Sequence, residues 1–419
     1  EHKVVKNLFA AKWVYEGIKD LKTVGIIYAD EKNRVYHVAE PVGVIAALAP
    51  TTNPTSTALF KALISIKSRN AVIFSPHPRA VDCTCQAAEI MHKAAVHAGA
   101  PEGIIGCIHY PTLESTSLLM RHPDIGVILA TGGSGMVKAA YSSGKPAFGV
   151  GPGNVPAYIE RSADVKKAVK AIIDSKTFDN GTICSSEQAL ICEKLNGQEV
   201  RQALLEKGGV FLTEEDMHKL ERYAFRYDGS LNPDIVGKPA VHIAERAGIR
   251  VYPDTKALVV ELGGVGMNFP LSREKLSPIL AYYEVENWQE ACELSKKLLA
   301  LGGMGHSLSI HSENREVITR FALEKPASRI VVNTPSCLGA IGGTTGLTPS
   351  LTLGCGTLGG NSTSDNVGPM NLLNIKRLAY EIISPEDLNR QLFSAELEGD
   401  PDEKLVKRIV MEVLKKISV

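Results

Sequence analysis

One cysteine lies in a loop of small polar residues and is the first candidate for chemistry. Cys184 belongs to the segment Asn-Gly-Thr-Ile-Cys-Ser-Ser, residues 180–186. Turn-forming residues of this kind leave a sulfur within reach of a substrate, and nearby backbone amides can stabilise its thiolate. Spacing alone leaves a second interpretation open, in which Cys184 is a buried structural thiol like most free cysteines. The loop therefore indicates a nucleophile only if other segments support it.

A glycine-rich turn is the second candidate. It follows an apolar run at 125–129, precedes a predicted helix from Met136, and includes Thr131, Gly132, Gly133, Ser134 and Gly135. The start of a helix exposes N–H groups and the positive end of the helix dipole, which favours bound phosphate. A Gly-x-Gly pattern by itself is more often a plain loop, so its position between a strand and a helix carries the interpretation.

The elements that position these segments follow an alternating pattern. Short β-branched runs predict strands at 44–48, 71–74, 104–108 and 125–129, with helices after Ser56 and after Arg79. A second block predicts helices at 164–177 and 288–301 and strands at 189–191, 308–311 and 329–332. This rhythm is typical of parallel sheets, so we expect two α/β units in series. The stretch 337–361 is rich in Gly, Thr and Ser and is expected to be a loop over a site rather than part of the core.

Composition excludes several classes of partner. The 419 residues include 46 basic and 46 acidic side chains, so the formal net charge is zero. A protein without net positive charge has no long-range electrostatic attraction for nucleic acid or anionic lipid. No apolar run approaches the roughly 18 residues that a membrane span needs, and no signal-peptide pattern is present. Eight scattered cysteines are expected to be free thiols in the cytoplasm. Residue 1 is Glu and opens directly into a helical pattern, so we expect that a preceding segment has been removed.

A group of cysteines and histidines raises the alternative of a metal site. Cys83 and Cys85 are followed by His92 and His97. The group lies on a predicted amphipathic helix and lacks the C-x2-C spacing of zinc sites. No metal site is therefore predicted.

Four segments together resemble motifs of the aldehyde dehydrogenase superfamily, in the order that the family has them. They are APTTNP at 49–54, the turn at 131–135, the cysteine loop at 180–186 and EKLSP at 274–278. The resemblance implies that Cys184 is the nucleophile and that the side-chain amide of Asn53 joins the N–H of Cys184 in holding an oxyanion. It further implies that the glycine-rich turn faces the pyrophosphate of a nicotinamide cofactor and that Glu274 holds the nicotinamide ribose.

Three further segments resemble the CoA-acylating subgroup found in aldehyde-alcohol and propionaldehyde dehydrogenases. Ser75 and Pro76, in FSPHPR at 74–79, stand where hydrolytic relatives have a Lys-Pro pair that touches the adenosine ribose. His306 lies in a Gly-His-Ser segment and either acts on the CoA thiol or hydrogen-bonds within a loop. The segment NVGPMN at 366–371 resembles a late signature of the subgroup. The implied cofactor is NAD, with NADP left open, and CoA is the second substrate.

A missing glutamate narrows the chemistry. Hydrolytic aldehyde dehydrogenases carry a general-base Glu about 35 residues before the nucleophile, and Gly149 stands at that spacing here, since 184 − 149 = 35. Glu261 begins a similar Glu-Leu-Gly-Gly sequence but comes 77 residues after Cys184, since 261 − 184 = 77. Water, with a pKa near 15.7, needs a base to attack a thioester, whereas a thiol with a pKa of about 8.5 is partly ionised already. The absence therefore favours transfer to CoA over hydrolysis.

The carboxyl-terminal segment predicts a separate amphipathic helix. Apolar residues recur on one stripe at Leu405, Val406, Ile409, Val410, Val413, Leu414 and Ile417, with basic residues elsewhere on the turn. The stripe either packs on an enzyme subunit or, as we favour, resembles the short helices that target enzymes into bacterial microcompartments. The second role implies a shell protein as partner and a location inside a microcompartment.

These inferences predict an α/β aldehyde dehydrogenase fold. We expect a Rossmann-like cofactor domain at 1–148, a catalytic α/β domain at 149–345, a site loop and oligomerisation segment at 346–383, a linker at 384–400 and the tail at 401–419. A small β element near 34–42 and after 366 is expected to join subunits into a dimer or tetramer.

The expected reaction is the reversible conversion of a short-chain aldehyde, such as propionaldehyde or acetaldehyde, with CoA and NAD to acyl-CoA and NADH through a thioacyl group on Cys184. The alternatives are a hydrolytic aldehyde dehydrogenase and a catalytically silent microcompartment adaptor.

Overall fold

The computed structural model describes residues 1–394 and 401–417. The chain divides into two compact units, and each is described by itself. The larger unit contains residues 1–21 and 41–373, and the smaller contains 22–40 and the described residues from 374 onward. None of the described helices combines the length and the apolar composition that crossing a membrane requires.

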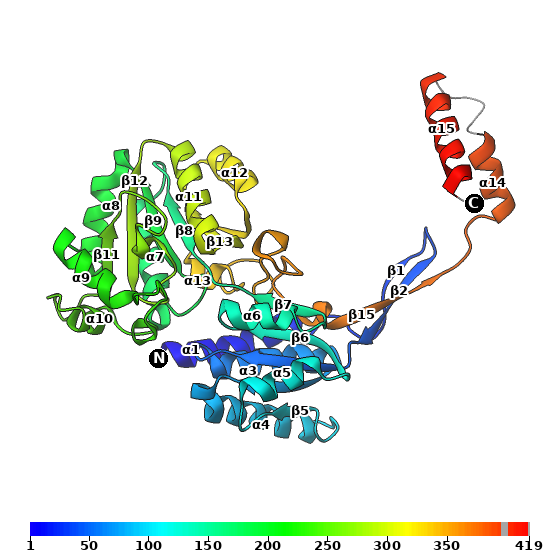
Figure 1. Cartoon of the computed structure of the whole chain (residues 1–419), viewed down its shortest axis with the longest axis horizontal. Helices are drawn as coiled ribbons and strands as arrows, with labels where there is room; N and C mark the ends of the chain where they lie inside the picture. Colours follow the sequence, from blue (N-terminus) through cyan, green and yellow to red (C-terminus); the bar gives the residue numbers. More distant parts are fainter. Residues whose placement is uncertain (395–400, 418–419) are drawn as a thin grey trace. The chain divides into compact units, whose positions relative to one another are not determined.

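The larger unit contains a five-stranded parallel sheet (Figure 1). Its strand order is β5-β4-β3-β6-β7, with β3 at Val44–Ala49, β4 at Ala71–Pro76, β5 at Ile105–Cys107, β6 at Ile125–Thr131 and β7 at Ala147–Val150. The helices between the strands are α3 (Pro54–Lys67), α4 (Val81–His97), α5 (Leu113–Arg121) and α6 (Ser134–Tyr141). Parallel strands need such crossovers, which is why the apolar runs and amphipathic stretches alternate.

The same unit contains a seven-stranded parallel sheet in the order β10-β11-β12-β9-β8-β13-β14. Its strands are β8 (Val155–Ile159), β9 (Glu187–Glu193), β10 (Gly209–Phe211), β11 (Ala257–Glu261), β12 (Ile279–Val285), β13 (Gly305–His311) and β14 (Ala327–Val332). Its helices are α7 (Val165–Thr177), α8 (Lys194–Glu206), α9 (Glu214–Ala224), α10 (Ala240–Arg246), α11 (Trp288–Gly302), α12 (Arg315–Glu324) and α13 (Ser336–Gly339). The chain passes from the five-stranded to the seven-stranded sheet between β7 and β8.

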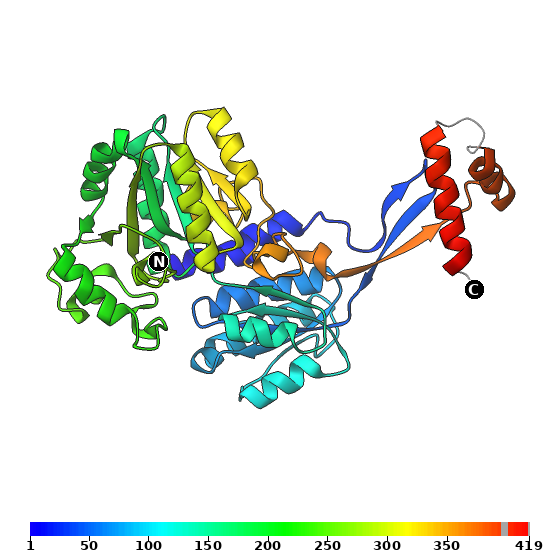
Figure 2. The ribbon, with the colours of Figure 1, turned by 45° about the horizontal axis from the view of Figure 1, so that its top comes forward.

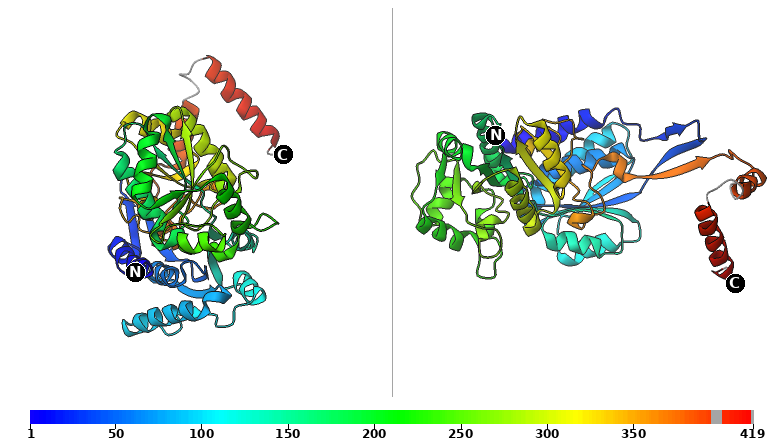
Figure 3. Two further views of the ribbon diagram at one scale, coloured as in Figure 1. Left: turned by 90° about the vertical axis from the view of Figure 1, so that its left-hand side faces the viewer. Right: turned by 90° about the horizontal axis from the view of Figure 1, so that it is seen from above.

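Helices cover both faces of each sheet, which buries strands that are apolar on both sides (Figure 3). In the seven-stranded sheet, α7 and α8 pack on one face, and α9 to α12 pack on the other. In the five-stranded sheet, α5 and α6 cover one face, and α3, α4 and the amino-terminal helical segment cover the other. That segment runs as one rod through α1 (His2–Leu8), a π-helical turn (Phe9–Trp13) and α2 (Val14–Ile18) (Figure 2).

The smaller unit contains a three-stranded sheet and two helices. Strand β2 (Val35–Pro41) pairs with β1 (Gly25–Asp30) and lies between it and β15 (Leu373–Ala379). The predicted linker at 384–400 is not irregular throughout, because helix α14 forms at Pro385–Ser394, and residues 395–400 lie outside the described residues. Helix α15 (Pro401–Ile417) forms where the tail helix was predicted, and residues 418–419 lie outside the described part.

Two further expectations need correction. The stretch 337–361 does contribute to a core, because Ala340, Ile341 and Leu353 are buried in a cluster with Val331. Apolar residues that alternate with glycines can pack in a core as well as those of a regular helix or strand. The Gly, Thr and Ser content of this stretch therefore gave the wrong prediction of its burial.

Not every cysteine is a free thiol, because Cys85 forms a disulfide with Cys107. This bond joins α4 to β5 and removes one ligand from the metal alternative. The Nε2 atom of His92 in turn accepts the N–H of Gly103 at 3.0 Å.

A buried guanidinium fixes the loop that follows α13. Arg329 on β14 is 3% exposed. It donates to the carbonyl oxygens of Gly354 at 2.6 Å, His306 at 2.9 Å and Ser364 at 3.2 Å. A charged donor that satisfies several buried carbonyls is costly to remove, because each carbonyl would lose its partner.

We predict that Arg329→Met lowers the free energy of unfolding by about 3 kcal/mol, because it leaves these carbonyls unpaired. Urea or thermal unfolding measures the change. The matched control is Arg320→Met on α12, where an exposed ion pair with Glu316 is expected to contribute less than about 1 kcal/mol. Equal stability of the two variants would contradict the role of Arg329.

Candidate active site

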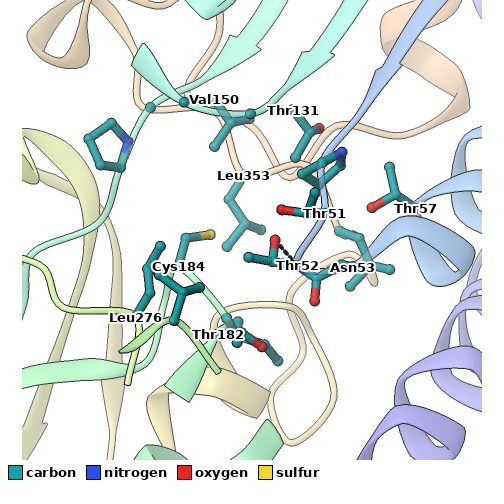
Figure 4. Close-up of a pocket in the computed structure, with 18 of the residues that line it drawn as sticks. Thr51, Thr52, Asn53, Thr57, Thr131, Val150, Thr182, Cys184, Leu276 and Leu353 are labelled. Carbon is teal, nitrogen blue, oxygen red and sulfur yellow. Dashed lines mark hydrogen bonds between the residues drawn. The ribbon is translucent and has the colours of Figure 1, made fainter. Parts of the chain in front are cut away.

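A cavity of about 340 Å³ lies at the carboxyl end of the five-stranded sheet, against the nucleophile loop of the seven-stranded one. It collects most of the predicted site residues, namely Cys184, Asn53, Glu274, Thr131, Gly132 and Gly133. Its other walls include Val150, Leu276, Ile341 and Leu353. Figure 4 shows the sulfur of Cys184 pointing into this space, across from Thr51, Thr52 and Asn53. Segments far apart in the sequence thus form one mixed polar and apolar site.

Cys184 is partly exposed and lies beside a cluster of apolar side chains. It packs against the cluster that contains Ile341 and Leu353. Burial raises the pKa of the thiol to about 12, the nearby Glu274 carboxylate adds to this rise, and the Arg329 guanidinium opposes it. The resting nucleophile is therefore a neutral thiol that must lose its proton before it attacks.

The loop that carries Cys184 has an unusual backbone. Asp179 and Asn180 both adopt left-handed conformations, with φ of 48° and 51°. Non-glycine residues in this region cost of order 1–2 kcal/mol each and persist only where the surroundings fix them. The Thr182 hydroxyl contacts the Asp179 carboxylate at 2.8 Å, and the Asn180 amide donates to the Gly237 carbonyl at 3.0 Å. These bonds shape the turn that presents Cys184.

Asn53 caps the start of α3 and lines the cavity. Its backbone is not helical, with φ of −141° and ψ of 52°. The side-chain Nδ2 donates to the Thr52 hydroxyl at 3.2 Å, and Oδ1 is buried with no hydrogen-bond partner among the described residues. An amide with unused capacity at the edge of a cavity is suited to bind a polar atom of a substrate.

The chain crosses directly behind the nucleophile between β7 and β8. A Cβ atom on Gly153 would lie 2.0 Å from the carbonyl oxygen of Cys184, so only glycine fits there. The N–H of Gly153 donates to Oε1 of Glu274 at 2.9 Å. Burial raises the pKa of this carboxyl group to about 7, while the Gly153 N–H and two lysines, Lys176 and Lys275, oppose the rise. Glu274 therefore titrates near neutral pH within the same cavity as Cys184.

Gly149 does not occupy the place expected from spacing. A Cβ on Gly149 would lie 2.6 Å from Val137 and 2.8 Å from Tyr141, so a side chain there would point at α6 and not into the cavity. The neighbouring Val150 lines the cavity instead. Residues 149–154 contain no acidic side chain, so this segment provides no general base, and Val150 rather than Gly149 turns its side chain to the cavity.

A second cavity of about 130 Å³ shares Pro50, His77 and the turn Thr131–Gly133 with the first. Ser75 and Pro76 line it, at the carboxyl end of β4. Ligands of open parallel sheets bind at this edge. Gly133 caps α6 without a side-chain bond, a Cβ on it would meet open space, and the buried Thr131 hydroxyl has no partner among the described residues. These features fit a dinucleotide, whose phosphates would face the helix start.

Two predicted residues lie away from the cavity surface. His306, at the start of β13, is fully buried, and its Nδ1 contacts the hydroxyl of Ser307 at 3.0 Å. Burial lowers the pKa of its ring to about 3, so it is neutral. The structure does not bring His306 into contact with the cavity, and a direct role on a CoA thiol has no support in this geometry. Gly135 belongs to α6 and lines neither cavity. Ser134 is the first residue of α6, and its side chain lies outside the described part of the chain.

Sequence reasoning missed several residues of the site, and two of them bear on its chemistry. Lys6 and Val150 line the main cavity, and neither carries a signal in spacing. A lysine on a helix is normally a solvated charge, and a valine in a short apolar run is normally core. Only the fold shows that both face Cys184.

Comparison with known proteins agrees with this geometry. The aldehyde dehydrogenase family model matches residues 2–210. The acetylating aldehyde dehydrogenase of Geobacillus thermoglucosidasius is 55% identical, with a TM-score of 0.90 over 91% of this chain and 84% of that one. The chain belongs to the aldehyde dehydrogenase family. The resemblance to acylating members and the predicted aldehyde dehydrogenase fold are thereby confirmed.

Two further members of the aldehyde dehydrogenase family are similar to this chain. The bifunctional aldehyde-alcohol dehydrogenase of Escherichia coli K12 is 48% identical over 90% of this chain, which spans only 43% of that protein. The propionaldehyde dehydrogenase of Rhodopseudomonas palustris, solved with bound propionyl-CoA, is 27% identical, with a TM-score of 0.81 over 90% of this chain and 81% of that one.

We predict that alkylation of Cys184 by iodoacetamide, without nucleotide, accelerates about tenfold per pH unit from neutral pH to beyond pH 9. The thiolate is the reactive form, and a raised pKa keeps its fraction small but growing over this whole range. Mass spectrometry of the Cys184 peptide measures the rate. An ordinary thiol with a pKa of about 8.5 would level off above that pH, and such a plateau would contradict the buried environment.

Proposed function

We propose that this chain is a CoA-acylating aldehyde dehydrogenase that converts a short-chain aldehyde, CoA and NAD to acyl-CoA and NADH. The observation that carries the proposal is a reachable Cys184 in a cavity whose wall at Val150 offers no carboxylate. The relatives named acetylating and the one solved with propionyl-CoA support the same chemistry.

In the proposed mechanism, the Cys184 thiol first loses its proton. Glu274, with a pKa of about 7 in the same cavity, is suited to accept it. The thiolate then adds to the aldehyde carbon, and the Asn53 amide and the Cys184 N–H stabilise the oxyanion. A nicotinamide cofactor, when bound beside this cavity, would supply the hydride acceptor. Loss of hydride leaves a thioester on Cys184, and the thiolate of CoA attacks its acyl carbon and releases the Cys184 thiolate.

The choice of NAD rests on the nucleotide groove. Among the described residues that line the smaller cavity there is no lysine or arginine. The Ser75 hydroxyl is already bonded to Thr116 at 2.8 Å. A cofactor with a 2′-phosphate normally needs a cation nearby, so this groove favours NAD over NADP. Glu274 is proposed to hold the nicotinamide ribose once the cofactor is bound.

The second candidate is a hydrolytic aldehyde dehydrogenase. It is favoured by Glu274, because a carboxylate with a pKa of about 7 beside the thioester could activate water as well as accept the thiol proton. One of its oxygens is held by the Gly153 N–H, so the outcome depends on whether the other reaches a water molecule.

We predict that NADH forms from propionaldehyde and NAD with steady turnover only when CoA is present. Val150→Glu, which places a carboxylate in the cavity wall, is expected to raise CoA-independent turnover by about 10²-fold, the range of general-base catalysis. Val150→Gln is the matched control with the same shape and no base. Spectrophotometry at the NADH absorbance measures all three proteins.

Steady turnover of the unmodified chain without CoA would favour the hydrolytic enzyme. No NADH with or without CoA would favour the catalytically silent adaptor.

We also propose that the three-stranded sheet joins subunits into a dimer or tetramer. Ile26 and Tyr28 on β1 and Leu378 on β15 are large, apolar and exposed in the smaller unit, and Tyr380 follows β15. Exposed apolar side chains on a small sheet are typical of an interface between copies.

The tail helix α15 is proposed to target the protein to a microcompartment shell. Its apolar residues Leu405, Val406, Ile409 and Val410 are exposed, with fractions between 46% and 60%. A helix of this length gains stability when its stripe enters a groove.

We predict that deletion of residues 401–419 leaves soluble, active enzyme and abolishes co-purification with shell proteins. Replacement of Lys404 and Lys407 by Ala, which keeps the apolar stripe, is the control and should preserve co-purification. Loss of activity or solubility after the deletion would instead show that α15 packs on the enzyme.

A further inference from the structure

The amino-terminal helix α1 reaches the loop that carries the nucleophile. Lys6 is only 4% exposed although it is charged, and its ammonium contacts the carboxylate of Asp179 and the hydroxyl of Thr182, the latter at 3.3 Å. The backbone N–H of Asp179 donates to Nδ1 of His2 at 2.9 Å. A buried charge is tolerated only where partners compensate it, so these contacts form a built connection and not a surface ion pair.

The same helix also holds the segment that carries Asn53. Lys3 donates to the Asp179 carboxylate at 2.9 Å and to the Thr52 carbonyl at 3.1 Å. Thr55, the second residue of α3, donates to the side chain of Asn7 at 2.8 Å. One helix thus connects the two segments whose N–H groups are proposed to stabilise the oxyanion.

Two observations indicate that Lys6 affects the chemistry of Cys184 as well as the stability of the fold. It lines the cavity that contains Cys184, so its positive charge acts on the sulfur across that cavity. Asp179, its partner, has a left-handed backbone that the surroundings must maintain. Burial lowers the pKa of Lys6 to about 8, with Asp179 opposing the change, so the ammonium form still predominates at neutral pH.

We propose that Lys6 is a positioning residue of the active site: through Asp179 it holds the Cys184 loop in its left-handed turn, and its charge favours the Cys184 thiolate. A role of Lys6 in catalysis rests on the proposed function. The effect of Lys6 on the reactivity of the Cys184 thiol can be measured without any substrate.

The test therefore measures alkylation of Cys184 by iodoacetamide near pH 7, where Lys6 is mostly charged, followed by mass spectrometry of the Cys184 peptide. Lys6→Met is expected to slow the reaction at least about fivefold, because it removes a cation from the cavity and leaves Asp179 without its buried cationic partner. Lys6→Arg keeps the charge and is expected to restore most of the rate. Lys12→Met, an exposed lysine of the same helical segment, is the matched control and should match the unmodified chain.

A double variant separates positioning from general damage. Asp179→Asn combined with Lys6→Met also removes the negative charge that Lys6 compensates near Cys184, so the double variant should react faster than Lys6→Met alone. A lysine with only a structural role predicts a double variant at least as slow as the single one. That result, or an unchanged or faster rate in Lys6→Met, would overturn the inference.

Lys3→Met keeps the test decisive if Lys6→Met does not fold. The Lys3 side chain is 63% exposed, so its loss should not prevent folding. Because it joins Asp179 to the Thr52 carbonyl, we expect kcat for acyl-CoA formation to fall about fivefold with little change in the KM for NAD. An unchanged kcat would contradict the connection. If no variant forms NADH but the alkylation rates change as expected, the proposed function fails and the role of Lys6 stands.

Discussion

The close crossing of the chain at Gly153 behind Cys184 is the constraint on which the site depends. The connection from the five-stranded to the seven-stranded sheet passes so near the nucleophile that a Cβ would lie 2.0 Å from the Cys184 carbonyl oxygen. At the same residue, the N–H binds Glu274. The crossing therefore fixes three things together: the backbone of the nucleophile, the carboxyl group in its cavity and the junction between the sheets.

This crossing also explains why a carboxylate is missing where hydrolytic relatives have their base. The strand that leads into it ends at Val150, whose side chain lines the cavity. Gly149 faces α6, where Val137 and Tyr141 leave no space. A thioester formed on Cys184 would thus be flanked by an apolar wall on this side, which slows attack by water and leaves a strong nucleophile such as a thiolate as the favoured acceptor.

Much of the fold could be predicted from the sequence because its central strands are short β-branched runs. Strands β3, β4 and β6 and helices α7 and α11 lie within a few residues of their predicted positions. Strands β7 and β8 were missed, because Gly149 and Pro156 interrupt their patterns. The order of strands in each sheet depends on crossovers, which no local pattern encodes.

The site could be predicted only as far as its motifs reach. Cys184, Asn53, Glu274 and the glycine-rich turn meet in one cavity, as the resemblance implied. The direction of side chains could not be predicted. Spacing therefore placed Gly149 in the cavity wall that Val150 forms, and it allowed a contact between His306 and the CoA thiol, although His306 is fully buried. Lys6 was missed because a buried lysine is recognised by its partners, and Asp179 lies 173 residues away.

The central claim is that Cys184 carries an acyl group that a thiol accepts more readily than water does. Incubation of the protein with propionyl-CoA alone, followed by mass spectrometry, tests it directly. We predict that the Cys184 peptide becomes propionylated and that the acyl group persists in buffer but is lost on addition of free CoA. Modification at other residues only, or loss of the acyl group at the same rate without CoA, would contradict the account.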